Sequence, residues 1–84
     1  MPTESYEPVT VGAVFRPGLI YPSWFLWHGR RYLVQAVTLR WQTREGRART
    51  LHVAVTDGTT SYELTLNQET LTWCLNVVET SGSM

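Results

Sequence analysis

Short alternations of apolar and polar residues recur along this chain, and turn-forming residues separate them. The clearest alternations cover residues 50–56, 61–66 and 72–78, where apolar side chains occupy every second position. A period of two is typical of β-strands that bury one face. No long stretch has the i, i+3, i+4 spacing of an amphipathic helix. The pattern therefore predicts an all-β protein.

Turn-forming residues separate these alternating segments at regular intervals. They are Arg16-Pro17-Gly18-Leu19, His28-Gly29-Arg30, Arg44-Glu45-Gly46-Arg47, Asp57-Gly58 and Asn67-Gln68-Glu69. Glycine in a tight turn accepts the positive φ that hairpin turns need. We therefore expect a single antiparallel meander of five or six strands. A chain of 84 residues is too short for two full sheets, so the meander should curl into a small barrel or half-open roll that hides its edges.

Two irregularities are expected within the strands. Gly12 lies inside an apolar segment that includes Val9 and Val11, and an interior glycine often marks a β-bulge. Residues 31–43 are expected to form one long strand. Its apolar positions change parity near Gln35 and Ala36, and a bulge there would restore one continuous inward face.

The chain length allows one domain. We expect a flexible lead-in at residues 1–8, a β domain at residues 9–79 and a flexible tail at residues 80–84. There is no signal-peptide pattern at the N-terminus and no apolar run near the roughly 20 residues that span a bilayer. Cys74 is the single cysteine and cannot form an internal disulfide. These features predict a cytoplasmic protein without a membrane partner.

Aromatic residues are concentrated between residues 20 and 28. On a strand, Phe25 and Trp27 would point one way, whereas Trp24 and Leu26 would point the other way. Both faces of this strand would then be apolar. Such a strand is either covered on both faces or leaves one face for a partner.

The segment at residues 25–34 also resembles a family of small bacterial domains of unknown function. The family motif is aromatic-x-Trp-x-Gly-Arg-x-Tyr-x-Val, followed by a further Trp. Its positions here are Phe25, Trp27, Gly29, Arg30, Tyr32, Val34 and Trp41. The resemblance extends over most of residues 9–79 and implies no known activity. It does imply a link to DNA repair, because some members are encoded near DNA-damage polymerases.

No pattern of catalytic or metal-binding residues is evident. Cys74 lies within an expected strand, His28 lies at a turn, and His52 should be an outward-facing strand residue. Asp57 and Glu63 are expected to be solvated residues of one hairpin. The glycines are isolated and form no phosphate-binding loop. We therefore expect no catalytic residue, cofactor, metal or small-molecule substrate, and we do not expect an enzyme.

The basic residues are consistent either with nucleic-acid binding or with a purely structural role. All seven are arginine and lie between residues 16 and 49, where Glu45 is the one acid. Arginine with tryptophan suits single-stranded nucleic acid, since the guanidinium pairs with phosphate and the rings stack on bases. Against this, the formal net charge is zero, whereas nucleic-acid-binding domains are usually basic. The arginines could also be solvated partners of the acids Glu45, Glu63, Glu69 and Glu79, and the tryptophans could fill the core.

A role in protein interaction or self-association uses the same residues. Tryptophan, tyrosine and arginine often dominate the binding energy of protein interfaces. Our leading hypothesis is a non-catalytic protein-interaction or assembly module, and the alternative is a nucleic-acid-binding accessory domain. In either case the expected partner-binding residues are Trp24, Arg30, Arg31, Arg40 and Trp41.

Overall fold

A computed structural model describes residues 6–80 and contains seven β-strands. The strands are β1 (Glu7–Arg16), β2 (Leu19–Trp27), β3 (Arg30–Leu33), β4 (Ala36–Glu45), β5 (Ala48–Thr56), β6 (Thr60–Asn67) and β7 (Thr72–Thr80). No helix occurs among the described residues. The all-β prediction is therefore confirmed. Within residues 6–80 there is accordingly no helical span with the length and hydropathy needed to cross a bilayer.

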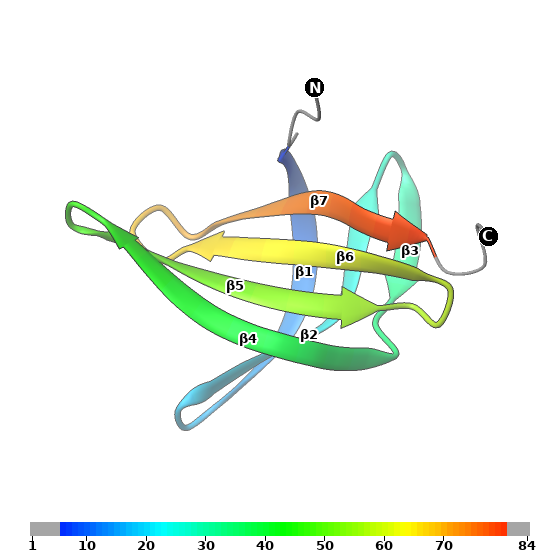
Figure 1. Ribbon diagram of the computed structural model, residues 1–84, viewed down its shortest axis with the longest axis horizontal. Coiled ribbons are helices and arrows are strands. Elements are labelled where there is room, and N and C mark those ends of the chain that lie inside the picture. The colour runs from blue at the N-terminus through cyan, green and yellow to red at the C-terminus, as the bar shows by residue number, and fades with distance from the viewer. Residues whose placement is uncertain (1–5, 81–84) are drawn as a thin grey trace.

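The strands form one antiparallel sheet in the order β3-β2-β1-β7-β6-β5-β4. This sheet curls into a half-barrel, in which β1, β2 and β3 lie behind the layer formed by β4 to β7 (Figure 1). β1 joins the two parts, because Glu7–Val9 pair with β7 and the remaining residues pair with β2. The prediction of one antiparallel sheet curled into a half-open roll is thus confirmed. The sheet is not a single meander, because β1 pairs with β7 and the consecutive strands β3 and β4 lie at opposite edges.

The number of strands is higher than predicted because the expected strand at residues 31–43 is split into β3 and β4. The break falls at Val34 and Gln35, close to the expected change in parity. The Val34 amide donates a hydrogen bond to the Ser23 carbonyl (2.9 Å), and the Gln35 amide donates one to the Thr56 carbonyl (2.8 Å). Consecutive residues thus bind strands from opposite halves of the chain. At this point the chain passes from one edge of the sheet to the other, and the predicted irregularity lies slightly further along, at the register shift between Val37 and Leu39 of β4.

A register shift between Gly12 and Ala13 confirms an irregularity at the predicted position, although the extra residue is on the partner strand rather than on β1. These residues pair with Trp24 and Pro22, so Ser23 of β2 is the extra residue. β1 begins at Glu7, two residues before the expected start of the domain. The other parts of the expected lead-in and tail, residues 1–5 and 81–84, lie outside the described residues.

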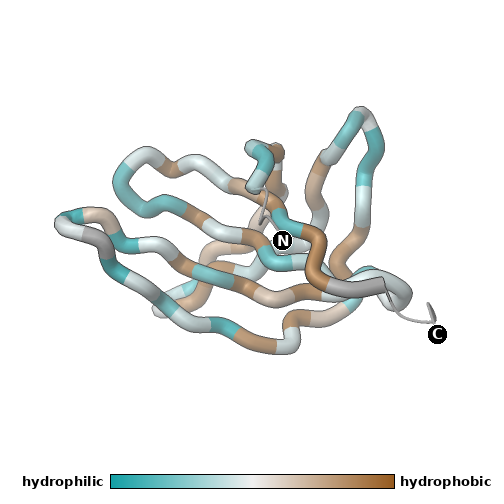
Figure 2. The backbone as a smooth tube through the Cα atoms, turned by 45° about the horizontal axis from the view of Figure 1, so that its top comes forward, coloured by the Kyte–Doolittle hydropathy of each residue, from teal (hydrophilic) through white to brown (hydrophobic). Residues whose placement is uncertain are grey.

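Alternation along the strands places the core inside the half-barrel. Brown and teal segments follow one another along the tube in Figure 2. The buried apolar residues of this core are Phe25, Leu51, Val53, Val55, Tyr62, Leu64, Leu66 and Leu75. The ring of Phe25 stacks on Tyr32 and meets Tyr62 edge-on, with centroid distances of 5.1 Å in both pairs. Such aromatic contacts stabilise a small core beyond the area they bury.

The aromatic segment of β2 divides between the two faces of the sheet as predicted. Phe25 is fully buried and Trp27 packs against the core. Leu26 is 40% exposed, and Trp24 lies opposite Gly12 on the outer face. After Trp27, a tight turn with positive φ at His28 (53°) and Gly29 (74°) leads into β3.

Candidate functional site

A groove opens where the edges of β2 and β4 diverge. β3 pairs only with residues 24–27 of β2, so residues 19–22 have β1 as their one neighbouring strand. β4 lies at the opposite end of the strand order and pairs with β5 alone. The cavity between them has a volume of about 570 Å³ and is lined by Leu19 and Ile20 of β2, by Arg40, Trp41 and Gln42 of β4, and by Leu51. Two strand edges without a second neighbour therefore face one cavity.

Arg40 spans this groove. Its Nη1 donates a hydrogen bond of 2.5 Å to the Ile20 carbonyl oxygen. Its guanidinium also lies 5.7 Å from the centre of the Tyr21 ring, which is within the range of a cation–π interaction. Arg40 alternates inward along β4 because it pairs with the buried Val53. A single side chain thus connects the two edges where no ladder does.

The other predicted basic residues lie away from the groove. Arg31 places its guanidinium 5.2 Å from the centre of the Trp24 ring, on the outer side of the β2–β3 hairpin. The same ring covers Gly12, where an added Cβ would overlap it. Arg30 lies 5.5 Å from the centre of the Tyr32 ring. The structure therefore brings Trp24 and Arg31 together, while neither these two nor Arg30 lines the groove.

Trp41 lines the groove, and its ring lies on the outer face of the sheet. Its ring stacks on His52 with a centroid distance of 4.9 Å and an interplanar angle of 7°. The side chain is 38% exposed. Of the five predicted partner-binding residues, Arg40 and Trp41 are the two at the groove.

No arginine forms an ion pair with any carboxylate among the described side chains. Both ion pairs in this part of the structure involve histidine, namely His28 with Glu7 and His52 with Glu63. Glu63 was a candidate partner for the arginines, and its two oxygens instead bind His52 and Tyr6. Among the described side chains, the arginines therefore have no carboxylate within ion-pair distance.

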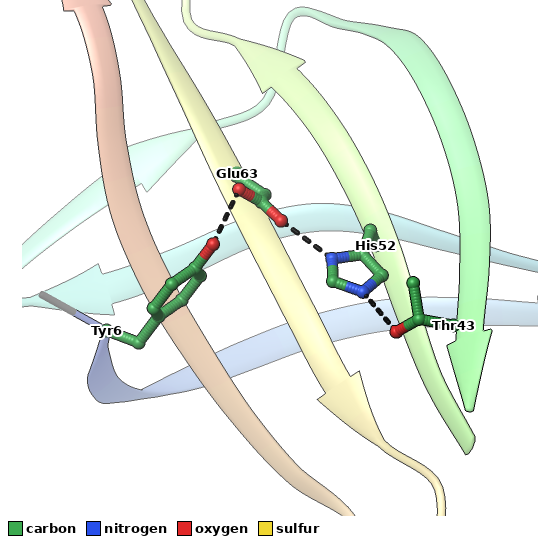
Figure 3. A network of polar contacts seen from close by, with 4 residues as sticks. All are labelled: Tyr6, Thr43, His52 and Glu63. Carbon is green, nitrogen blue, oxygen red and sulfur yellow. Dashed lines mark hydrogen bonds and ion pairs between the residues drawn. The ribbon is translucent and has the colours of Figure 1, made fainter. Parts of the chain in front are cut away.

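A polar network that the sequence did not predict connects β4, β5, β6 and the start of the described chain (Figure 3). The Tyr6 hydroxyl donates to Glu63 Oε1 (2.9 Å), Glu63 Oε2 pairs with His52 Nδ1 (2.7 Å), and His52 Nε2 bonds Thr43 Oγ1 (2.8 Å). The side chains of His52 and Glu63 are only 15% and 13% exposed. His52 was predicted to face outward, but its partners depend on the strand register, which no short motif encodes.

The order hydroxyl, imidazole, carboxylate is also that of a hydrolase triad. Acyl transfer further requires hydrogen-bond donors for the developing oxyanion. The cavity beside this network is lined by Tyr6, Thr43, Thr50, His52 and Thr65. Thr50, His52 and Thr65 pair with neighbouring strands on both sides, so their backbone N–H groups are used within the sheet. The hydrogen bonds of the network connect β4, β5 and β6 across the sheet.

Asp57 organises the turn between β5 and β6. Its Oδ1 accepts hydrogen bonds from the amides of Thr59 (2.9 Å) and Thr60 (2.8 Å), and Oδ2 accepts one from the Tyr62 hydroxyl (3.1 Å). Partial burial raises the pKa of Asp57, but these hydrogen bonds outweigh burial and hold it below its ordinary value. Burial also raises the pKa of Tyr62.

Glu7 anchors the start of β1 to the β2–β3 turn. Its Oε1 accepts a hydrogen bond of 2.6 Å from Trp27 Nε1 and lies 3.0 Å from His28 Nε2. The hydrogen bond from Trp27, followed by the charge of His28, lowers the pKa of Glu7. In the described part of the chain, no group of three His, Cys, Asp or Glu residues is placed to hold a metal ion.

No family model matches the chain, and no curated protein or solved structure matches it either. The resemblance to small bacterial domains therefore stays a prediction. What the chain can do must be argued from its own geometry.

Proposed function

We propose that this chain is a small, non-catalytic module that binds another protein through the groove between β2 and β4. The observation that supports this most directly is the groove itself, which is bordered by two strand edges and is lined by Arg16 and Arg40, neither of which pairs with a described carboxylate. Exposed apolar side chains extend the surface on either side, with Phe15 at 69% and Leu39 at 59% exposure. Exposed apolar residues grouped beside arginine are typical of partner sites.

The alternative is a nucleic-acid-binding accessory domain, with the DNA-repair link that the family resemblance implies. The arginines favour it, because none of them pairs with a described carboxylate and they could pair with phosphates. The positions of the tryptophans argue against nucleic-acid binding. Trp24 is engaged with Gly12 and Arg31, Trp41 has one ring face on His52, and Trp27 and Trp73 pack against the core. Few ring faces are thus available for bases to stack on.

Photo-crosslinking from matched positions tests the proposed function. Leu39 and Leu33 are exposed to similar extents, 59% and 64%, but lie on β4 and β3, at opposite edges of the sheet. Each is replaced in turn by benzoylphenylalanine, and the protein is irradiated in the cells that produce it. A defined protein adduct from position 39 and none from position 33 is expected. Adducts from both positions, or from neither, would contradict a protein site at the groove.

Titration with single-stranded oligonucleotides tests the alternative. If about four arginines bind phosphates, the logarithm of the binding constant should fall with the logarithm of salt concentration at a slope of roughly −3. Tryptophan fluorescence at low and high salt gives this slope. We expect no salt-dependent binding, and binding with that slope would favour the nucleic-acid-binding alternative.

The free thiol of Cys74 supports a reducing, cytoplasmic setting for the module.

A further inference from the structure

The edge of β4 is long and regular. After a register shift between Val37 and Leu39, residues 39–45 pair with β5 without interruption. A strand at the edge of a sheet presents unpaired backbone N–H and C=O groups along its free side. An extended segment can bind such an edge by continuing the ladder, and its side chains then determine specificity. At about 3.3 Å per residue, residues 39–45 offer room for about six or seven residues of such a segment.

The two faces of this edge differ in character. Arg40, Gln42 and Arg44 pair with Val53, Leu51 and Arg49, and thus share the face that is turned toward the inside of the half-barrel. Leu39 and Trp41 lie on the outer face, where Trp41 stacks on His52. Charged residues that point inward on an edge strand disfavour pairing with an ordinary apolar strand. The same charges favour a strand that places carboxylates opposite them.

The surroundings of the groove strengthen this charge preference. Arg16 lines the cavity together with Arg40, and Arg47 and Arg49 line a neighbouring depression that also includes Glu69. None of these arginines is within 4.0 Å of a described carboxylate. A second copy of this chain would bring the same arginines to the same edge, and like charges on adjacent strands destabilise pairing.

We propose that β4 binds an extended acidic segment of a partner protein, which pairs with the free edge of residues 39–45 and fills the groove beside β2. This inference rests on the proposed function and specifies its partner. The segment alternates acidic residues, which face Arg40 and Arg44, with apolar residues, which lie beside Leu39 and Trp41. Its backbone satisfies the amide and carbonyl groups that β4 leaves unpaired.

A synthetic octapeptide of alternating glutamate and valine is the probe, and amide NMR of the whole protein is the readout. We expect shifted and exchange-protected amides in β4, with little change in β6. Two control peptides separate charge from strand pairing. The first carries lysine in place of glutamate, and the second is N-methylated at alternate residues so that its backbone cannot donate to β4. Neither should protect the β4 amides.

Two matched substitutions test the role of charge. Arg44→Gln is expected to weaken binding of the glutamate–valine peptide about tenfold, in line with the loss of one charge-assisted hydrogen bond. Arg31→Gln removes the same charge from the outer side of the β2–β3 hairpin and should leave the affinity unchanged. Arg40→Gln should also weaken binding, although Arg40 additionally bonds Ile20, so Arg44 is the cleaner position.

Equal binding of the N-methylated peptide would overturn strand addition, and binding of the lysine peptide would overturn the acidic partner. Self-association of β4, seen as a dimer by light scattering, would overturn the choice of partner while leaving a protein site at the groove. If no peptide binds but position 39 still crosslinks to a protein, the strand-addition inference fails and the proposed function stands. Binding of an oligonucleotide that competes at β4 would overturn both.

Discussion

Three of the arginines contact aromatic rings, namely Arg30, Arg31 and Arg40, and Arg40 also binds a backbone carbonyl. The acids Glu7, Asp57 and Glu63 contact histidine, tyrosine, tryptophan and backbone amides instead. Arg31 lies over Trp24 and Arg40 over Tyr21, while Glu63 holds His52 and Tyr6. A guanidinium over a ring keeps its N–H groups available at the rim, since the ring contacts only the face of the cation. These contacts leave N–H groups of Arg31 and Arg40 able to bind anions outside the chain.

At Gly12, replacement by alanine is expected to destabilise the protein because the new Cβ would overlap the Trp24 ring. Forcing the ring away should lower the free energy of unfolding by about 1–3 kcal/mol. Chemical denaturation of the variant measures this loss. In a Trp24→Ala background the Gly12→Ala substitution should cost much less, because the obstructing ring is gone. An equal cost in both backgrounds would show that the ring is not responsible.

Glu63→Ala is expected to lower the free energy of unfolding by about 1–3 kcal/mol, because it leaves the partly buried His52 Nδ1 without its carboxylate. Glu69→Ala is the matched control, since Glu69 is exposed and should change stability by no more than about 0.5 kcal/mol. Urea denaturation compares the two variants. Similar losses in both would mean that the network contributes nothing measurable.

Among the elements, the β5–β6 turn should make the fold sensitive to acid. The folded pKa of Asp57 is lowered, so its contribution is present above the unfolded value of about 3.9 and is lost as the pH falls through the lower folded pKa. Asp57→Asn keeps an acceptor for the amides of Thr59 and Thr60 but removes the titrating charge. Urea midpoints between about pH 5 and pH 2 should therefore fall less steeply in this variant than in the parent. Parallel curves would contradict the role of Asp57.

Elements with one local signal were predictable from the sequence. The alternation of apolar and polar residues predicted β5, β6 and β7, because each of these strands buries one face and a period of two is specific to such strands. The turn at Gly29 was equally clear, since it needs positive φ. The break at Val34 was not predictable, because the parity change that marks it is also what a bulge produces. Only the bonds to Ser23 and Thr56 distinguish the two, and these partners are distant in sequence.

The candidate site was predictable only in its residue types. Arg40 and Trp41 were expected to bind a partner, and both line the groove. They lie apart from Trp24 and Arg31 because the chain passes at Val34 and Gln35 from β3, at one edge of the sheet, to β4 at the other edge. The pairing of His52 with Glu63 likewise depends on the register between β5 and β6. No local pattern carries this information, because it arises only when the strands are aligned.

For the molecule as a whole, protection from hydrogen exchange should follow position in the sheet. β5 and β6 are each paired along most of their length on both sides, and they supply six of the eight buried core residues, Leu51, Val53, Val55, Tyr62, Leu64 and Leu66. Their amides should exchange slowest, whereas those of the four-residue edge strand β3 should exchange fastest among the strands. Exchange measured by NMR checks this order. Faster exchange in β5 than in β3 would contradict it.

The transfer of the chain at Val34 and Gln35 also divides the molecule into two separable pieces. Residues 6–34 contain the complete β1–β2–β3 meander, and residues 35–80 contain the complete β4–β7 meander. Apart from core packing, the described connections between the two pieces are the short ladder of Glu7–Val9 with β7 and the hydrogen bonds of Arg40 to Ile20 and of Tyr6 to Glu63. A chain cut between these two residues is therefore suited to fragment complementation, in which the mixed halves recover the near-ultraviolet circular dichroism of the Phe25 and Tyr62 rings.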